Sequence, residues 1–594
     1  MLKKRLIEDE DLEKPFNWEQ FKRLMSYLKP HLKYVLFTLF LMLVASLVSL
    51  AGPYLFQIAI DNYMVKGKFL ELSMVALAYL ACNFIGMICA RLRIQTMSTV
   101  GQKVLYRLRQ DLFNHIQTLS FTFFDSRPAG KILVRIINDV NSLGDLLTNG
   151  IINVLTDAFT LVVTIFIMIS IHARLALITF STLPLLLLSI MLLKKHIRKR
   201  WQTVRKKNSN MNAYLHESLA GMRVTQAFVR EPETREVYHS LSGDIQDSWM
   251  GAIKVQNLFW PSVELVGALG SVLVYWFGVQ FLDDGSVTVG ILVAMTSYVW
   301  RFWAPINNLT NFYNSLLSAM SSTERIFEML DVKPDIKDEE DAVEMPEIKG
   351  EVTFDHVSFY YDPEKPVLED INFTVKPGET IALVGPTGAG KSTIVSLISR
   401  FYDPVKGRVL IDGYDIKKVK LNSLRRQMGV MLQDTFIFSG TIMDNIRYGR
   451  LDATDEEVME AARLVHADEF IRQMEKGYYT EVQERGSRLS QGQKQLISFA
   501  RALLADPRIL ILDEATSSID TKTEQLVQKG LEQLLKGRTS FVIAHRLSTI
   551  RNADRIMVVD QKGIIESGSH DELIKLKGHY YELHQAQYRF LQAM

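Results

Sequence analysis

A glycine-rich loop in the second half of the chain has the residue types and spacing needed to hold phosphate groups. Its sequence GPTGAGKST, residues 385–393, matches the pattern G-x-x-x-x-G-K-[ST]. The loop follows the strand-like apolar run 380–384 and opens a helical pattern at 392–401, which is the context that the pattern requires. An incidental lysine in a glycine-rich turn is the alternative, and the flanking strand and helix argue against it. The sequence therefore predicts a binding site for a nucleoside triphosphate.

Each part of the loop has a place in this chemistry. The glycines let backbone amides curl around anionic oxygens at a helix N-terminus, where the helix dipole also favours negative charge. Lys391 would reach the outer phosphates, and the hydroxyl of Ser392 would bind Mg²⁺. The predicted nucleotide-binding residues of the loop are Gly385, Thr387, Gly388, Ala389, Gly390, Lys391, Ser392 and Thr393.

Two carboxylates stand at the end of another apolar strand, within the sequence ILILDEATSSID at 509–520. Open α/β folds bind their ligands at the carboxyl ends of the strands, so these acids would lie near the loop. Asp513 would hold Mg²⁺, and Glu514 could orient or deprotonate the attacking water. Two acids at a strand end can also merely cap a helix, but the phosphate-binding loop in the same chain favours catalysis.

The composition indicates a membrane protein with several domains. Of 594 residues, 48% are hydrophobic, which is a high share for a soluble chain of this length. The 68 Lys and Arg nearly balance the 66 Asp and Glu, so the net charge gives no sign of a nucleic-acid partner. Both cysteines, Cys82 and Cys89, lie in one apolar stretch, which argues against a disulfide framework or a thiolate metal site. The acidic N-terminal segment lacks the apolar core of a secretory signal, so a cytoplasmic start is expected.

Six apolar stretches are each close to the roughly 20 residues that a bilayer crossing requires. They are residues 34–54, 70–90, 152–171, 175–193, 261–282 and 287–307. An amphipathic helix on the membrane surface is expected just before them, beginning at Trp18. The links near 91–150 and 194–260 are long and rich in Lys and Arg, so the positive-inside rule places both in the cytoplasm. Each link is expected to turn at a tip that docks on a soluble domain, at 122–127 and within 217–231.

Four polar residues stand out within the apolar stretches, namely Asn153, Asp157, Glu264 and Arg301. Ionisable groups at membrane depth are costly and usually face a partner or a wet cavity. Arg301 either neutralises Asp157 or Glu264, or it contacts a substrate, and the sequence leaves both alternatives open.

The composition changes after Met320. An acidic, proline-marked stretch at 332–351 indicates a solvated linker, and strands then alternate with helices. The predicted fold class is an α-helical six-span transmembrane domain followed by an α/β nucleotide-binding domain with the phosphate-binding loop. The expected divisions are an N-terminal segment with the amphipathic helix at 1–33, the transmembrane domain at 34–320, the linker at 321–350 and the nucleotide-binding domain at 351–594.

A further short motif, LSQGQ at 489–493, lies just upstream of the acidic strand. It is similar to the signature motif of the ATP-binding cassette family, and it leads into a helix and then the acidic strand in that family's order. The resemblance implies roles for three other residues. Gln433 would bind and sense Mg²⁺, and His545 would contact the γ-phosphate as a catalytic switch. Tyr361 would stack on adenine, with Tyr360 as the weaker alternative.

The resemblance also implies a dimer, because in the family the signature contacts the nucleotide held by the other subunit. The residues expected to do so here are Ser490, Gly492 and Gln493. The chain has one phosphate-binding loop and one membrane half, so a second half-transporter is the expected partner. Gln491 stands where the family motif LSGGQ has glycine, which favours a heterodimer over a homodimer. Glu514 would then drive hydrolysis together with the partner's signature.

The fused order, with the membrane half first, resembles exporters of this family rather than importers. We expect the chain to use ATP and Mg²⁺ to move amphipathic, drug-like compounds out of the cytoplasm or the inner leaflet by alternating access. A flippase or exporter of lipids or envelope precursors is an alternative, and an ATP-gated regulator or channel is another. The expected location is the plasma membrane of a bacterial cell, in contact with membrane lipids, with the nucleotide-binding domain in the cytoplasm.

Overall fold

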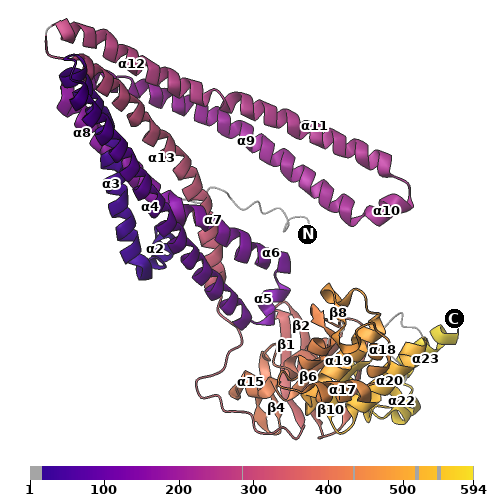
Figure 1. The fold of residues 1–594 in the computed structure, drawn as a ribbon. Coiled ribbons are helices and arrows are strands. Elements are labelled where there is room, and N and C mark those ends of the chain that lie inside the picture. Colours follow the sequence, from indigo (N-terminus) through magenta and orange to yellow (C-terminus); the bar gives the residue numbers. More distant parts are fainter. Residues whose placement is uncertain (1–16, 284, 432–434, 515–520, 545–549, 593–594) are drawn as a thin grey trace. The chain divides into compact units, whose positions relative to one another are not determined.

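The computed structural model describes residues 17–283, 285–431, 435–514, 521–544 and 550–592 of the chain (Figure 1). The chain forms two compact units. The first holds Met1–Gln117 and Ala129–Asp331, and the second holds Thr118–Pro128 and Val332–Met594. The short segment 118–128 therefore belongs to the second unit, although helices of the first unit flank it in the sequence.

The first unit is built from helices. They are α2 (Trp18–Ser26), α3 (Leu32–Ile58), α4 (Phe69–Thr118), α6 (Ala129–Val134), α7 (Val140–Asp145), α8 (Ile151–Phe180), α9 (Leu183–Ala220), α10 (Met222–Ala227), α11 (Glu231–Gln256), α12 (Phe259–Asp283) and α13 (Val289–Leu330). With 50 residues, α4 is about 75 Å long at about 1.5 Å per residue. A bilayer's hydrocarbon core is about 30 Å thick, so α4 continues well beyond it, as the long polar links predict.

The second long link also forms an extended hairpin, in which α9 and α11 lie side by side (Figure 1). Trp201 of α9 and Trp249 of α11 meet edge to face with ring centroids 4.9 Å apart. Nearer the tip, the hydroxyl of Tyr214 donates a hydrogen bond to the carbonyl oxygen of Thr234 at 2.9 Å. The hairpin ends at α10, which lies within the predicted tip.

Four helical segments of the described residues are long and apolar enough to cross a membrane, namely Lys29–Met64, Phe69–Thr118, Ala129–Phe180 and Glu231–Asp283. The other two predicted spans, 175–193 and 287–307, are mostly helical as well, in α8 with α9 and in α13. The first of these is interrupted, because α8 and α9 are separate helices with Pro184 in the first turn of α9, where its missing amide is tolerated. His172 leaves helical geometry inside α8, at φ −158° and ψ 100°, and separates the third predicted span from the fourth.

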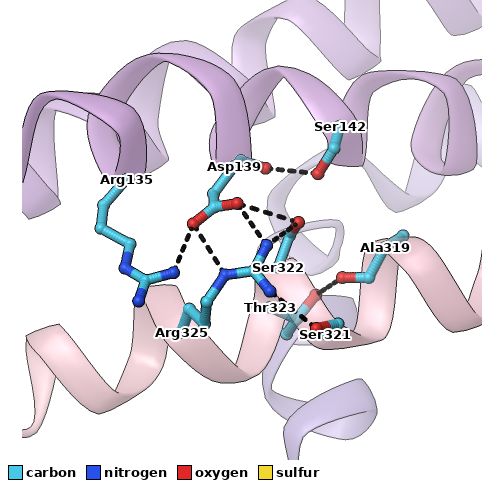
Figure 2. A network of polar contacts seen from close by, with 8 residues as sticks. All are labelled: Arg135, Asp139, Ser142, Ala319, Ser321, Ser322, Thr323 and Arg325. Carbon is cyan, nitrogen blue, oxygen red and sulfur yellow. Dashed lines mark hydrogen bonds and ion pairs between the residues drawn. The ribbon is translucent and has the colours of Figure 1, made fainter. Parts of the chain in front are cut away.

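A buried carboxylate ties α13 to the segment just before α7. Asp139 ends a π-helical turn, Arg135–Asp139, and is only 5% exposed. It accepts two hydrogen bonds from the guanidinium of Arg325, at 3.0 and 2.5 Å, and one from Arg135 at 3.0 Å (Figure 2). Ser322 donates to the same carboxylate at 3.1 Å. Both carboxylate oxygens are engaged, so the network fixes how the two helical segments lie against each other.

The second unit is an α/β fold. Its strands are β1 (Val352–Asp362), β2 (Lys365–Val375), β3 (Thr380–Val384), β4 (Lys406–Ile411), β5 (Tyr414–Asp415), β6 (Met428–Met431), β7 (Gly440–Thr441), β8 (Glu481–Val482), β9 (Ile509–Glu514), β10 (Thr539–Ala544), β11 (Arg555–Asp560) and β12 (Gly563–Gly568). Its helices include α5 (Phe121–Asp125), α14 (Lys391–Ile398), α15 (Leu421–Arg425), α16 (Ile442–Arg447), α17 (Asp455–Leu464), α18 (Asp468–Arg472), α19 (Gln491–Ala505), α20 (Thr521–Leu535), α22 (His570–Leu576) and α23 (His579–Gln592).

Two sheets organise this unit. A four-stranded antiparallel sheet has the order β2-β1-β4-β5, and a six-stranded sheet has the order β12-β11-β3-β10-β9-β6. In the larger sheet all neighbours from β11 to β6 are parallel. Successive side chains of a strand point to opposite faces. Ile381 and Leu383 of β3 therefore join the apolar layer shared with the antiparallel sheet, while Ala382 and Val384 join the layer that includes α19. The end of β3 is thus fixed from both sides.

The first predicted tip is the short helix α5, which lies slightly before the predicted range 122–127. Ser120 has extended backbone geometry and starts the helix. Arg127 precedes Pro128, and the residue before a proline disfavours helical geometry, so the helix ends early.

Candidate nucleotide-binding site

The glycine-rich loop leaves β3 and curls back at its glycines. Gly385 has a φ of +146°, Gly388 of +86° and Gly390 of +107°, values that residues with a Cβ rarely adopt. A Cβ on Gly385 would lie 2.1 Å from the carbonyl oxygen of Val559 in β11. A Cβ on Gly390 would lie 2.7 Å from Cδ2 of Leu368 in β2. Only glycine lets the loop backbone approach both strands this closely.

The tip of the loop is exposed at Thr387 and Gly388. The amide of Ala389 donates to the carbonyl oxygen of Pro386 at 3.2 Å, which closes a tight turn. Ala389 also packs against the apolar layer below the antiparallel sheet. The turn therefore leads the chain directly into α14, whose N-terminus opens toward the loop.

Lys391 begins α14, and its ammonium group lies over the loop. Nζ donates hydrogen bonds to the carbonyl oxygens of Gly385 at 2.9 Å and Pro386 at 2.8 Å. The side chain is 8% exposed. Burial lowers the pKa of Lys391, and the negative charge of Asp513 acts in the opposite direction. A cation held beside a glycine-rich turn at a helix N-terminus is the arrangement that binds the outer phosphates of a nucleotide.

Tyr361 connects the antiparallel sheet to α14. Its hydroxyl lies 3.2 Å from Oγ1 of Thr393, and either oxygen can donate. The side chain of Tyr361 is 54% exposed, which leaves much of the ring accessible. An accessible aromatic ring beside the phosphate-binding helix suits stacking of a purine base. Tyr361 makes this contact with α14, which favours it over Tyr360 for the predicted base-stacking role.

Asp513 lies near the carboxyl end of β9, between β10 and β6 in the larger sheet. Its charge acts on Lys391, so the acid and the loop lysine are within electrostatic reach of each other. Ser392, in the first turn of α14, is exposed. Mg²⁺ prefers hard oxygen ligands and is usually held by one or two protein groups together with waters and substrate phosphates. The Ser392 hydroxyl and the Asp513 carboxylate fit such an ion.

The predicted signature residues begin α19. The hydroxyl of Ser490 accepts a hydrogen bond from the amide of Gln493 at 3.3 Å, and the side chain of Gln493 accepts one from the amide of Ser490 at 2.9 Å. Ser490 and Gln491 are exposed, whereas Gly492 is buried. None of the hydrogen bonds that Ser490 or Gln493 makes in the described part of the chain reaches the glycine-rich loop. The signature thus forms an exposed helix N-terminus, separate from the lysine cradle.

Three predicted site groups lie outside the described residues: Gln433, His545 and the side chain of Glu514. The backbone of Glu514 is described as the last residue of β9, in register with Ala544 of β10.

Arg301 and Asp157, two of the polar residues in the apolar stretches, form hydrogen bonds with partners that were not predicted. The guanidinium of Arg301 donates to the hydroxyl of Ser49 on α3. Asp157 accepts a hydrogen bond from Asn308 at 3.3 Å, and Glu264 is exposed. Among the residues that the structure describes, Arg301 forms no ion pair with either acid. The alternative in which Arg301 neutralises Asp157 or Glu264 is therefore not supported, and contact with a substrate stays a prediction.

Sequence reasoning missed one neighbour of the predicted base-stacking residue. The ring of Tyr402 lies edge-on to Tyr361 with centroids 5.1 Å apart, and its hydroxyl donates to Asp125 of α5. The signal available in the sequence was the aromatic pair Phe401 and Tyr402 directly after α14. A pair of aromatic residues at a helix end gives no indication of a contact with a segment so far away in the sequence.

Comparison with known proteins matches both halves of the chain. The sequence model described as "ABC transporter transmembrane region" matches residues 35–304, and the one described as "ABC transporter" matches residues 368–517. The chain is 48% identical over 582 residues to "Uncharacterized ABC transporter ATP-binding protein YknV" of Bacillus subtilis, covering 98% of this chain and 96% of that protein. It is 41% identical over 515 residues to "Fatty acid ABC transporter ATP-binding/permease protein" of Mycobacterium bovis, covering 87% of this chain and 81% of that protein.

A solved structure shares the architecture. It is described as a bacterial Atm1-family ABC exporter with ATP bound, and it matches with a TM-score of 0.78 and 31% identity over 93% of this chain and 98% of that chain. The predicted fold class, a helical transmembrane domain followed by an α/β nucleotide-binding domain, is confirmed. The chain therefore belongs to the ABC transporter family, as an exporter half that joins one transmembrane region to one ATP-binding domain.

Proposed function

We propose that this chain is one half of an ATP-driven exporter that moves amphipathic compounds, drug-like molecules among them, out of the cytoplasm or the inner leaflet by alternating access. The observation that carries the proposal is the lysine cradle between β3 and α14, in a chain whose helices are long and apolar enough to cross a membrane. Hydrolysis of ATP at the cradle supplies the energy, and the helical unit supplies the path.

The residues have distinct roles in this proposal. Lys391 binds the β- and γ-phosphates, and Tyr361 stacks on the adenine. Ser392, Asp513 and Gln433 would hold Mg²⁺, which would neutralise the charge that develops on the phosphates. Glu514 orients or deprotonates the attacking water, and His545 contacts the γ-phosphate. The residues that complete the partner's site across the dimer are Ser490, Gly492 and Gln493.

An exporter half of this kind works as a dimer, and we propose that the partner is a different chain. The exposed side chain of Gln491 stands at the first position of α19, where the partner's nucleotide would approach the helix amides. Glycine at this position would leave those amides open, whereas a long side chain obstructs them. The site that uses this signature is therefore expected to turn over poorly, and the site that uses Glu514 is expected to drive the cycle.

The second tip, α10, has an apolar surface suited to contact the nucleotide-binding unit of the other half. Val224, Phe228 and Val229 at this tip are exposed apolar residues. The nucleotide-binding unit has an exposed aromatic cluster to receive such a tip, in which the ring of Phe438 stacks on Tyr448 with centroids 4.6 Å apart. We propose that α10 of the partner docks on this cluster and transmits the movement of the nucleotide-binding units.

The chain is a multi-pass membrane protein, and its placement in the cell belongs to the proposal. We place it in a bacterial plasma membrane with the nucleotide-binding domain in the cytoplasm, where ATP is available. The proposed divisions remain 1–33 for the N-terminal segment, 34–320 for the transmembrane domain, 321–350 for the linker and 351–594 for the nucleotide-binding domain.

The test is transport by the native complex in liposomes. The complex is purified with its partner, reconstituted with nucleotide sites facing outward, and supplied with ATP and a fluorescent amphipathic dye. We expect ATP-dependent accumulation of the dye inside the liposomes, and none with Lys391→Ala. ATP-independent equilibration of the dye would instead indicate a channel or a regulator.

A second candidate substrate class is lipids. The relative named as a fatty acid transporter favours it, because that name describes an amphipathic compound with a single acyl chain. Stimulation of ATP hydrolysis by fatty acids or phospholipids, with no response to dyes, would assign the exporter to lipids.

A further inference from the structure

The first tip packs beside the predicted adenine side of the nucleotide site, within the second unit. Phe121 of α5 and Phe401, just after α14, lie with ring centroids 4.4 Å apart. Ser120 donates a hydrogen bond to Asp335 in the linker at 3.0 Å. The ring contact places α5 against a residue that follows the phosphate-binding helix, and both belong to the second unit.

Tyr402 is held from two sides. Its hydroxyl donates a hydrogen bond to the carboxylate of Asp125 in α5. Its ring packs edge-on against Tyr361, at 5.1 Å and 89° between ring planes, and against Phe359 at 5.6 Å. Burial, followed by the bond to Asp125, raises the pKa of Tyr402 well above its usual range. The hydroxyl therefore remains a hydrogen-bond donor at every physiological pH.

Tyr361 continues the contact toward the nucleotide. Its hydroxyl bonds to Thr393 in the first turn of α14, two residues after Lys391. Four side chains in succession, Asp125, Tyr402, Tyr361 and Thr393, thus join the first tip to the phosphate-binding helix of the same chain. Both neighbours constrain the orientation of the Tyr361 ring. Thr393 forms a hydrogen bond with its hydroxyl, and the ring of Tyr402 packs against its ring.

We propose that Tyr402 is a positioning residue that couples adenine binding at Tyr361 to the first tip through its bond to Asp125. The inference rests on the proposed role of Tyr361 in stacking on adenine. A base stacked on Tyr361 stabilises the ring orientation that packs against Tyr402, and the bond to Asp125 fixes α5 in the same arrangement. Coupling between two sites is reciprocal, so movement of α5 away from Tyr402 weakens adenine binding.

The experiment is a double-mutant cycle on the complete transporter, purified with its partner and reconstituted in liposomes. Tyr402→Phe keeps the ring beside Tyr361 and removes the bond to Asp125, whereas Asp125→Ala removes the same bond from the other side. We expect each variant to raise the KM for ATP on the order of threefold to tenfold, with a smaller change in kcat at saturating ATP. The double variant is expected to match either single variant, because both remove one interaction.

A second measurement separates positioning from a general defect. Inorganic triphosphate, which has no base, competes with ATP for the cradle around Lys391. We expect its inhibition constant to be the same in wild type and Tyr402→Phe, since only base binding is altered. Tyr414→Phe is the matched control, because it removes the hydroxyl of an exposed tyrosine in β5 of the same unit. Its KM for ATP is expected to equal that of wild type.

The outcomes distinguish this inference from the proposed function. If Tyr361→Ala raises the KM for ATP while Tyr402→Phe does not, Tyr361 binds the base but Tyr402 has no positioning role. Additive effects in the double variant, or equal loss of ATP and triphosphate binding, would also overturn the inference. If Tyr361→Ala leaves the KM unchanged while Lys391→Ala abolishes hydrolysis, the adenine role of Tyr361 itself fails.

Discussion

Gly385 carries the tightest steric constraint in the nucleotide cradle. Gly385 and Gly378 both have positive φ, at +146° and +79°, but a Cβ on Gly378 would meet nothing within 4 Å. Backbone strain of about 1–3 kcal/mol is expected for alanine at either position. Gly385→Ala adds a clash with the backbone oxygen of Val559, and overpacking of this kind costs about 1–3 kcal/mol more. We therefore expect Gly385→Ala to melt at a lower temperature than Gly378→Ala and to lose ATP binding. Equal melting temperatures would contradict this account of the loop.

The buried position of Lys391 predicts a pH dependence. Its pKa is lowered by burial in the folded chain, so the charged form is disfavoured there relative to the unfolded chain. Without nucleotide, this lysine costs stability as pH falls through the interval between the folded and unfolded pKa values, because the unfolded chain binds the proton more tightly. Phosphate binding needs the ammonium form. The affinity for ATP should therefore fall as pH rises, and the fall should begin at a lower pH than for an exposed lysine.

The measurement is ATP affinity at a series of pH values that approaches the ordinary pKa of a lysine from below. Lys391→Arg is the control, because a guanidinium does not titrate in this range. We expect weaker binding by the arginine variant but a flat pH profile. A wild-type profile as flat as that of Lys391→Arg would show that Lys391 stays charged throughout.

Single residues were predictable from the sequence where local geometry determines them. The glycine spacing, the lysine after the third glycine and the acid at the end of β9 all follow from one strand, one turn and one helix. The contact of Tyr402 with Asp125 was not predictable, because it joins residues separated by 277 positions. The same holds for Asp139 and Arg325, which are 186 positions apart.

At the level of helices and strands, the length of the apolar stretches and the alternation of apolar residues predicted the elements. They did not predict where a helix is interrupted. The apolar residues of 175–193 give one continuous pattern, yet α8 ends at Phe180 and α9 begins at Leu183, next to Pro184. Hydropathy cannot distinguish a helix with a break from a straight one, since it does not register backbone geometry. The π-helical turn Arg135–Asp139 was not predicted either; it ends at the carboxylate that Arg325 binds.

The Asp139 network predicts the stability of this part of the first unit. Asp139→Ala would leave the guanidinium of Arg325 without its carboxylate in a poorly exposed site. Removing one partner of a buried ion pair costs about 3–5 kcal/mol. That range is an upper bound here, because Arg325 is 20% exposed and keeps its hydrogen bonds to Ser321 and Ser322. We expect a clearly lower melting temperature for Asp139→Ala and a smaller loss for Asp139→Asn, which keeps an oxygen acceptor. If Asp139→Ala with Arg325→Met is no more stable than Asp139→Ala alone, the uncompensated charge is not the cause.

For the whole molecule, the sequence specified the two kinds of unit and their order along the chain. It did not specify that residues 118–128 belong with the nucleotide-binding unit, because that grouping depends on contacts with Phe401 and Tyr402. The residues that we propose complete the other half's site lie at the N-terminus of α19, which is exposed at Ser490 and Gln491.

The final prediction concerns the pair of nucleotide sites. With Gln491 in this chain's signature, the two sites of the transporter are expected to be unequal, and most hydrolysis should depend on Glu514 of this chain. Glu514→Gln should therefore abolish most ATP turnover by the native complex. Gln491→Gly reopens the helix amides and should raise total turnover by up to about twofold, as a second site begins to work.

Gln491→Ala separates the length of the side chain from the presence of a Cβ. If close approach of the backbone to the nucleotide is what matters, alanine should resemble glutamine, because both carry a Cβ. If only bulk matters, alanine should resemble glycine. The asymmetry itself is tested by counting the chains and the trapped nucleotides in the purified native complex. A homodimer in which both sites hydrolyse ATP equally would remove the argument for a different partner chain, since the same glutamine would then be present in two competent sites.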